Sequence, residues 1–246
     1  VGTIHHASYD NGVSQSAAGP LAGDGAALFD GVNDVVTAAD DASLEPARVT
    51  VAAWLYPAAG IADAAAAVTK IGGMFGWYVD GYGLEYRSDG QAYFFINDDR
   101  NLTDARGRRV GATIPLETWS HVVGTYDGAE LRIYVNGALV TSAAYDQPIR
   151  PSTGLYIGGG IAGVVPWKGG IDEVALFATA LTAADVAAIY SVRDPIVGGN
   201  VDHQPIHSLI GLELRVMMHA GKQSSTGQAI EPRVSIAAAN VDPVAS

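Results

Sequence analysis

Residues 119–137 read Trp-Ser-His-Val-Val-Gly-Thr-Tyr-Asp-Gly-Ala-Glu-Leu-Arg-Ile-Tyr-Val-Asn-Gly, and this stretch decides the fold. Its first eight residues are rich in β-branched and aromatic side chains, which suit a pleated strand. Residues 131–135 alternate in side-chain character, as a half-buried strand does. Asp-Gly and Asn-Gly close these two runs, and both dipeptides tolerate the positive φ of a tight hairpin turn. With a third strand-like run at 138–145, the stretch predicts a three-stranded antiparallel meander.

Outward from the meander, short strand-like runs alternate with glycine-containing turns, which is typical of a β-sandwich or jelly roll. The expected strands are 26–37 (two short strands), 49–56, 68–71, 75–79, 84–87, 92–96 and two within 153–177. The Ala-rich segment 58–67 is expected to be a loop, and Gly72-Gly73 and Asp80-Gly81 are read as turns. One helix is expected at 182–191, with Thr182 as its cap and Asp185 in its first turn.

Three segments resemble the laminin-G-like, concanavalin A-like lectin/glucanase jelly-roll family. They are the meander signature, the opening run Ala-Leu-Phe-Asp-Gly-Val-Asn-Asp-Val-Val at 27–36, and the closing run Gly-Ile-Asp-Glu-Val-Ala-Leu-Phe at 170–177 with the helix that follows. The order and spacing are similar to those of the family over about residues 21–192. The resemblance implies an all-β antiparallel jelly-roll sandwich with one short helix. It leaves function open, because this fold carries lectins, enzyme appendages, adhesion modules and virion parts.

Composition narrows the function classes. The 246 residues carry a formal net charge of −12, and an acidic surface repels phosphate backbones, so nucleic acid is not an expected partner. There is no cysteine, which excludes disulfides and thiolate chemistry. No run of apolar residues is long enough for a membrane span, so no membrane insertion is expected. Because the chain starts at Val1, we expect a processed protein or a fragment of a longer one.

The chain divides into a jelly roll at 1–192 and a C-terminal extension at 193–246. Asp194-Pro195 and Gly198-Gly199 are typical of a linker. A strand pattern follows at 212–216, and a second strand is expected at 233–237. A lone hairpin is marginal in water, so the extension is expected to pack on the main domain, a neighbouring subunit or a partner. Our domain prediction favours a neighbour or partner.

The first candidate site would hold calcium. Asp172 lies in an apolar strand, where a buried carboxylate is costly unless it is paired, hydrogen-bonded or metal-bound. Asp30, Asn33 and Asp34 supply oxygen atoms from a tight loop, and oxygen ligands suit a hard cation. The family resemblance implies that this loop and the closing strand lie near each other and often hold structural Ca²⁺. The alternative is that Asp172 accepts backbone N–H bonds and no ion is bound.

The second candidate site would bind glycans. Sugars stack on aromatic faces beside amide and carboxylate groups. Aromatic side chains cluster at 77–93, polar groups follow, and one further tryptophan lies beside Gly and Pro. The predicted glycan-binding residues are Trp77, Tyr82, Tyr86, Asn97, Asp98, Arg100 and Trp167. The alternative is that most of these aromatic side chains are core, although we expect exposure most of all for Tyr82 and Trp167.

Catalysis is not expected. No His-Glu-x-x-His, Gly-x-Ser-x-Gly or Walker pattern is present, and the Glu-x-Asp-x-x-Glu strand of the family's glucanases is missing. The sequence therefore predicts a non-catalytic carbohydrate-binding or adhesion module on an extracellular or virion surface. Its partners would be glycans and, through 193–246, other subunits of an assembly such as a phage tail, fibre or capsid decoration. The alternatives are a purely structural component and a targeting module of a polysaccharide-active enzyme.

Overall fold

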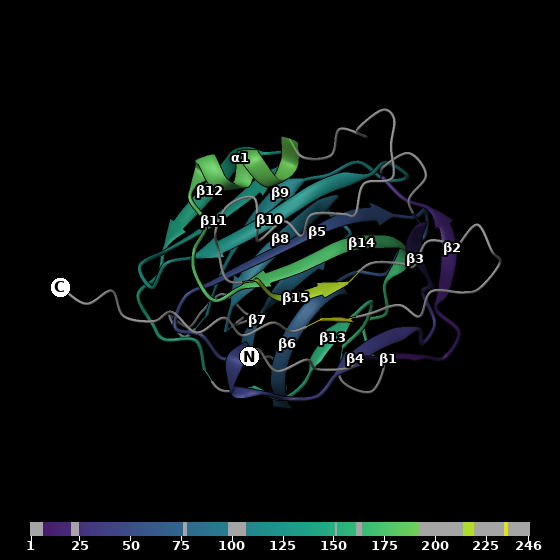
Figure 1. Ribbon diagram of the computed structural model, residues 1–246, viewed down its shortest axis with the longest axis horizontal. Helices are drawn as coiled ribbons and strands as arrows, with labels where there is room; N and C mark the ends of the chain where they lie inside the picture. Colours follow the sequence, from purple (N-terminus) through teal and green to yellow (C-terminus); the bar gives the residue numbers. More distant parts are fainter. Residues whose placement is uncertain are drawn as a thin grey trace.

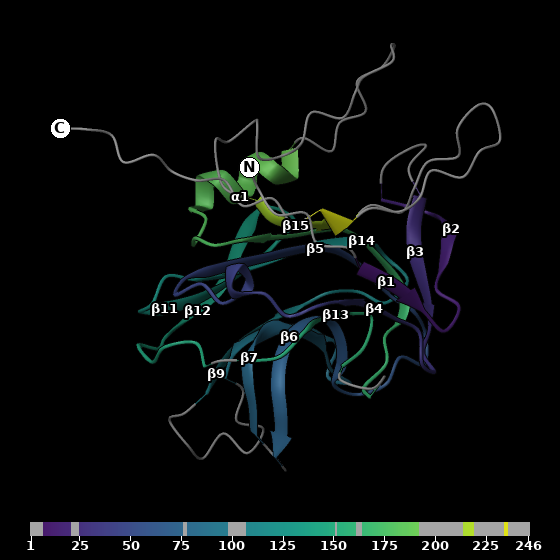
Figure 2. The ribbon, with the colours of Figure 1, turned by 60° about the horizontal axis from the view of Figure 1, so that its bottom comes forward.

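The computed structural model shows a two-layer β-sandwich with one helix on its outer surface (Figure 1). It describes residues 7–20, 25–75, 78–97, 107–150, 152–160, 164–191, 214–218 and 234–235. In Figure 2 the layer with β6, β7 and β13 lies below the layer with β5 and β14, and α1 lies above both. The predicted all-β antiparallel jelly roll is confirmed.

The first sheet has seven strands among the described residues, and every neighbouring pair is antiparallel. In spatial order these strands are β1 (Ala7–Asp10), β4 (Val35–Ala38), β13 (Leu155–Ile157), β6 (Ala65–Phe75), β7 (Tyr78–Tyr86), β8 (Gln91–Ile96) and β9 (Arg108–Thr113). Strand β1 therefore forms one edge of this sheet, at the end farthest from β9.

The second sheet has nine strands within the described part of the chain. Seven of them run in the order β12 (Ala138–Ala144), β11 (Glu130–Val135), β10 (Ser120–Tyr126), β5 (Val49–Pro57), β14 (Lys168–Phe177), β15 (Leu214–Met218) and β16 (Val234–Ser235). Strand β3 (Gly25–Asp30) also pairs with β14 and carries β2 (Ser14–Ala18) on its other side. Strand β14 thus has β5 along one edge, and first β3 and then β15 along the other.

The predicted meander is β10, β11 and β12. The turn between β11 and β12 is made by Asn136 and Gly137, with φ values of 50° and 80°. These are the positive values for which Asn-Gly is favoured. Asp127 organises the other turn, because its Oδ1 accepts hydrogen bonds from the backbone N–H groups of Ala129 and Glu130, at 2.9 and 2.8 Å.

The prediction for 58–79 is wrong in detail. Strand β6 starts at Ala65 and continues to Phe75, so it includes both part of the expected loop and the expected turn at Gly72. Strand β7 likewise runs through Gly81. A Cβ atom on Gly81 would lie 2.0 Å from the carbonyl oxygen of Lys70. Glycine is therefore present because neighbouring backbones approach closely, and not because the chain turns.

The main core lies between the two sheets and contains side chains from both, including Phe29, Val51, Leu55, Phe94 and Val122. Charged side chains are enclosed as well, and Lys70 is 0% exposed. Its Nζ donates to Asp40 Oδ1 at 2.7 Å, to Ser152 Oγ at 3.1 Å and to the carbonyl oxygen of Thr153 at 2.6 Å. Asp40 lies two residues before the short 3-10 helix η1 (Ala42–Leu44), so this buried lysine joins β6 to the segments before η1 and before β13.

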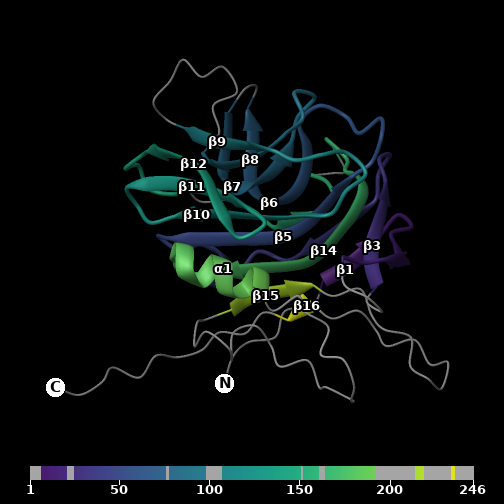
Figure 3. The same cartoon turned by 90° about the horizontal axis from the view of Figure 1, so that it is seen from above.

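Helix α1 (Ala183–Ser191) covers part of the outer face of the second sheet (Figure 3). It starts as predicted, because Asp185 accepts a hydrogen bond from Thr182 N at 2.9 Å and Thr182 Oγ1 accepts one from Asp185 N at 3.2 Å. Val186 and Ile189 pack against a small cluster that includes Ala52, Val123, Ala175 and Phe177. The ring of His121 contacts the rings of Trp54 and Tyr190, at centroid distances of 5.2 and 5.8 Å.

Strand β15 pairs with β14 of the same chain, with Val174 opposite Met218, and β16 pairs with β15. The strand patterns expected in the extension thus add to the second sheet. Helix α1 has nine residues, and among the described residues no helix has the length and apolar character needed to cross a bilayer.

Candidate functional site

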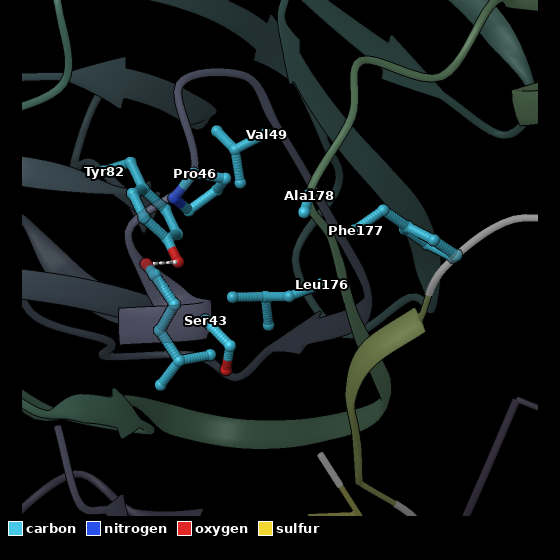
Figure 4. Close-up of a pocket in the computed structure, with 8 residues that line it drawn as sticks. Ser43, Pro46, Val49, Tyr82, Leu176, Phe177 and Ala178 are labelled. Atoms are coloured by element: carbon cyan, nitrogen blue, oxygen red, sulfur yellow. Dashed lines mark hydrogen bonds between the residues drawn. The ribbon is translucent and has the colours of Figure 1, made fainter. Parts of the chain in front are cut away.

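Three aromatic residues predicted to bind glycans belong to the core. Tyr82 is 1% exposed, and its hydroxyl donates to the carbonyl oxygen of Leu44 at 2.8 Å. Figure 4 shows this bond beside Val49 and Leu176, whose side chains leave no room for a ligand. Burial raises the pKa of Tyr82 far above its ordinary value. The expectation that Tyr82 is exposed is therefore wrong, because its position on β7 faces the core.

Trp167 and Tyr86 are also enclosed. Trp167 is 0% exposed, and its ring meets the ring of Tyr86 edge-on at a centroid distance of 6.3 Å. Proximity to Gly and Pro suggested an exposed loop tip, but Trp167 immediately precedes β14 and points into the sandwich core. Neither side chain is available to a sugar in this conformation. Trp77 lies outside the described residues.

Asn97 has a structural role. Its Oδ1 accepts hydrogen bonds from the N–H groups of Gly81 (3.2 Å) and Arg150 (2.9 Å). Its Nδ2 donates to Tyr145 Oη (3.1 Å) and to the carbonyl oxygen of Pro148 (2.8 Å). Both donors and both acceptor positions of the amide are used inside the protein, so none is left for a ligand. Asp98 and Arg100 lie outside the described residues.

The predicted calcium ligands do not gather at one point. Asp30 is the last residue of β3 and Asp34 lies in the loop that leads to β4, and Asp30 N donates to Asp34 Oδ2 at 3.0 Å. Asp172 is on β14, where Asp30 is opposite Lys168 in register. Four residues of strand separate Asp172 from that pairing, which is about 13 Å. Within the described part of the chain, no three His, Asp or Glu side chains form a group able to hold a metal.

Two of the four predicted ligands are buried, since Asp172 on β14 is 0% exposed and Asp34 is also enclosed. Asp34 is 4% exposed, and its Oδ1 has no hydrogen-bond partner within the described part of the chain. Burial raises the pKa of this carboxyl group, although the hydrogen bond from Asp30 N opposes the shift. Asn33, next in sequence, is exposed. The loop therefore combines one buried acid with exposed polar groups.

This loop is a corner where the chain passes from one sheet to the other, and the β1–β2 connection is another. Strand β3 belongs to the second sheet and β4 to the first, and β1 and β2 are divided between the sheets in the same way. The β1–β2 corner is an Asn11-Gly12 turn with φ values of 65° and 107°. Asn11 Nδ2 donates to the carbonyl oxygen of Asn33 at 3.0 Å. This hydrogen bond holds the two corners side by side at the edge of the first sheet.

A hollow of about 510 Å³ opens between these corners and β13. It is lined by Asp10, Asn11, Asn33, Val35, Thr37, Tyr156 and Gly160. Its volume falls within the range of about 300–1,000 Å³ that is usual for small-molecule sites. It is the larger of the two hollows described here, since the one beside Tyr82 has almost no free volume.

Pairing between strands places the lining side chains in rows. Thr37 is directly opposite Tyr156 on β13, and Asp10 is opposite Val35. Thr37 Oγ1 donates to Asp10 Oδ2 at 3.0 Å. Tyr156 packs against the buried pair Ile71 and Phe95, which form a small apolar cluster on this sheet. The hollow thus combines one fixed aromatic side chain with carboxylate, amide and hydroxyl groups, which is chemistry that suits a sugar.

Sequence reasoning placed Asn33 in a calcium loop and missed the other polar and aromatic lining residues, Asp10, Asn11, Thr37 and Tyr156. The Asn11-Gly12 dipeptide was a usable turn signal. Nothing local marked Thr37 or Tyr156, because each lies in a strand of only three or four residues. They meet only after β4 pairs with β13, a contact between distant parts of the chain.

Comparison with solved structures finds similar folds among toxin binding domains. The receptor-binding domain of botulinum neurotoxin C/D mosaic serotype aligns with a TM-score of 0.58 and 12% identity, over 76% of this chain and 46% of that chain. The receptor-binding domain of botulinum neurotoxin D aligns with a TM-score of 0.59 and 12% identity, over 77% of this chain and 48% of that chain. The binding domain of Paraclostridial Mosquitocidal Protein 1 aligns with a TM-score of 0.58 and 11% identity, over 76% of this chain and 47% of that chain. This chain therefore spans about half the length of those domains.

No curated protein matches the sequence. The profile of the concanavalin A-like lectin/glucanases superfamily (Laminin_G_3) matches residues 30–187, which is more than half of the chain. The match covers the sandwich from the β3–β4 corner to α1. The chain belongs to the concanavalin A-like lectin/glucanase superfamily.

Proposed function

We propose that this chain is a non-catalytic carbohydrate-binding module and that its glycan site is the hollow between β1, β4 and β13. The observation that carries the proposal is the hollow itself. Asp10, Asn33, Thr37 and Tyr156 surround a volume of a size suited to a small ligand. Hydroxyl groups of a sugar need such polar partners, while its C–H faces pack on an aromatic ring.

The comparisons support the same class of function. Members of this superfamily include lectins, and one similar structure is a botulinum neurotoxin binding domain in complex with SialylT. At 12% identity that similarity concerns the fold, so the site proposed for this chain rests on its own residues. No enzymatic role is proposed, because a binding role needs nothing beyond the hollow.

We further propose that the module acts outside a cell or on a virion surface, as part of a larger assembly such as a phage tail, fibre or capsid decoration. A second candidate is a purely structural component of such an assembly. Strand β12 favours that alternative, because it is an edge strand with Leu139 and Val140 about half exposed. An edge of this kind is able to accept a strand from another protein.

Structural calcium remains a proposal for the β3–β4 loop alone. Asp34 Oδ1 is a buried carboxylate oxygen without a hydrogen-bond partner in the described part of the chain, and Asp30 and Asn33 supply further oxygen atoms nearby. Such ligands would fit a hard cation if backbone oxygens or water completed the set. We expect calcium to raise the melting temperature of the purified chain and Asp34→Asn to remove that effect. An unchanged melting temperature with calcium and with a chelator would exclude the site.

The test of the glycan site is binding of the purified chain to a broad glycan array, with calcium and with a chelator. Tyr156→Ala is expected to lower affinity for any bound glycan at least tenfold, because it removes the aromatic wall. Tyr93→Ala is the matched control, since Tyr93 is a half-buried tyrosine of the same sheet that lies outside the hollow. Absence of glycan binding by the folded protein would favour the structural role. An equal loss of glycan affinity in Tyr156→Ala and Tyr93→Ala would reject the assigned site.

A further inference from the structure

The hollow carries an unusual balance of charge. Among the described residues that line it, Asp10 is the one acidic residue, and none is Lys, Arg or His. Asp34 lies immediately behind the rim, where its Oδ1 is 3.6 Å from the position of a Cβ atom built on Gly12. The chain as a whole has a net charge of −12. Within the described part of the chain, the formal charges on this rim and directly behind it are therefore negative, apart from one lysine.

That lysine is Lys168, whose ammonium group forms a hydrogen bond with another part of the chain. Its aliphatic stem passes beneath Gly31, where a Cβ atom would lie 2.8 Å from Lys168 Cβ. Its Nζ donates to the carbonyl oxygen of Ala59 at 2.9 Å, on the connection between β5 and β6. The ammonium group therefore is not among the groups that line the hollow. It supplies no hydrogen bond to a ligand there.

Hydrogen bonds within the rim occupy the Thr37 hydroxyl proton and one of the two Asn11 amide protons, and they leave several acceptors free. Thr37 gives its hydroxyl proton to Asp10 Oδ2, and Asn11 Nδ2 gives a proton to the carbonyl oxygen of Asn33. Asp10 Oδ1 takes no hydrogen bond within the described part of the chain, and Asn11 Oδ1 and Thr37 Oγ1 keep acceptor positions. An acceptor-rich site binds ligands that donate hydrogen bonds, such as hydroxyl and ammonium groups.

We propose that the hollow takes glycans without negative charge, either neutral or amino-bearing, and discriminates against carboxylated and sulfated ones. This inference rests on the proposed function and names its ligand class. An anionic group at the rim would face Asp10 and Asp34 with no cation to offset the repulsion.

The experiment is calorimetric titration of the full chain with three oligosaccharides of equal length: cellohexaose, glucosamine hexamer and hexagalacturonate. They are respectively neutral, amino-bearing and carboxylated. We expect one or both of the first two to bind at least tenfold more tightly than hexagalacturonate at low salt. We expect Asp10→Asn to weaken glucosamine-hexamer binding about tenfold and cellohexaose binding less, because the amide oxygen still accepts a hydrogen bond. Asp146→Asn, an exposed acid outside the hollow, is the control, and the melting temperature reports folding.

The outcomes separate the inference from the function on which it rests. If hexagalacturonate binds as tightly as the others and Tyr156→Ala abolishes its binding, the hollow is a glycan site and the charge inference is overturned. If all binding persists in Tyr156→Ala, the hollow is not the site and both proposals are wrong. If none of the three binds, and a broad array also shows no ligand, the proposed function itself fails.

Discussion

Asn97 shows how a polar residue suited to sugar recognition serves the fold instead. It has a φ of 48°, a left-handed conformation that asparagine tolerates better than most residues. Its amide links β7, through Gly81, to the segment that contains Tyr145, Pro148 and Arg150. The side chain therefore fixes a connection that no regular pairing of strands holds.

Asn97→Ala is expected to destabilise the protein by about 2–4 kcal/mol, because it leaves several buried polar groups without partners. Chemical denaturation gives the change in unfolding free energy. Gln147→Ala, at an exposed position on the same segment, is the control and should change stability by less than about 0.5 kcal/mol. Glycan affinity per folded molecule should be unchanged in Asn97→Ala, and a selective loss of affinity would restore this residue to the binding site.

Asp34 predicts a pH dependence of stability. Burial raises its pKa above 3.8 in the folded state, so the folded protein binds the proton more tightly than the unfolded chain does. The stability contributed by the protonated carboxyl group is complete below the unfolded pKa and is lost as pH rises through the folded pKa. We therefore expect the difference in unfolding free energy between the wild type and Asp34→Asn, measured in the presence of a chelator, to fall as pH rises from about 4 to 7. A difference that does not vary with pH would contradict this assignment.

At the scale of elements, the meander could be predicted because its information is local. Each strand carries its own alternation, and Asn136-Gly137 adopts the backbone conformation that the dipeptide favours. The β6–β7 hairpin was misread because glycine has two uses in β structure. Gly81 permits a close approach of two backbones within the sheet, and the same residue type marks turns elsewhere. Sequence alone does not distinguish these uses.

The candidate site was harder to predict than the fold. Tyr82 and Trp167 have the residue types and neighbours expected of sugar-binding aromatic residues, but burial is decided by which face of a strand meets the other sheet. The register of β6, β7 and β13 sets that face, and it depends on pairing between distant segments. Tyr156, in contrast, belongs to a three-residue strand with no pattern of its own.

Strand β12 is an open edge without charge. Its sequence is Ala-Leu-Val-Thr-Ser-Ala-Ala, and side chains on both of its faces are largely exposed. Natural edge strands usually carry a lysine, a proline or a bulge that discourages pairing with another chain. Here a register shift at Ile133 and Tyr134 of β11 is the irregularity beside this edge. Among the described edges, we expect this strand to be the place of contact with another molecule.

Val140→Lys is expected to reduce concentration-dependent self-association, because a charge on the edge opposes pairing of strands. Its effect on unfolding free energy should stay within about 0.5 kcal/mol, since Val140 is 51% exposed. Light scattering over a range of protein concentrations measures the change. Val32→Lys, in an exposed loop rather than on an edge, is the matched control. Equal behaviour of the two variants would show that β12 does not mediate association.

At the scale of the whole molecule, the hollow and the C-terminal strands lie on different sheets. Strands β1, β4 and β13 belong to the first sheet, whereas β15 and β16 extend the second. The domain boundary predicted near residue 192 therefore leaves every lining residue of the hollow in place. A chain ending there should keep its glycan affinity within about twofold of the full chain.

The same truncation should lower stability, because it uncovers the edge of β14 between Val174 and Phe177. Thermal unfolding of the two chains measures the change, and titration with the same oligosaccharide measures affinity. A truncated chain that folds but no longer binds the oligosaccharide would show that the extension takes part in recognition. A chain of unchanged stability would show that the β14–β15 pairing contributes little.

Strand β14 also has a consequence for how the protein is made. Its Ile171 is paired with Ala27 on β3 and with Leu55 on β5. Strand β14 therefore lies between two strands that are synthesised well before it. During translation the local meander is able to form as soon as it leaves the ribosome, because its strands are adjacent in sequence. The opening strands must wait, with an apolar face uncovered, until β14 emerges. The N-terminal third of the nascent chain therefore has to stay free of aggregation until β14 has been synthesised. A chaperone would act during this interval.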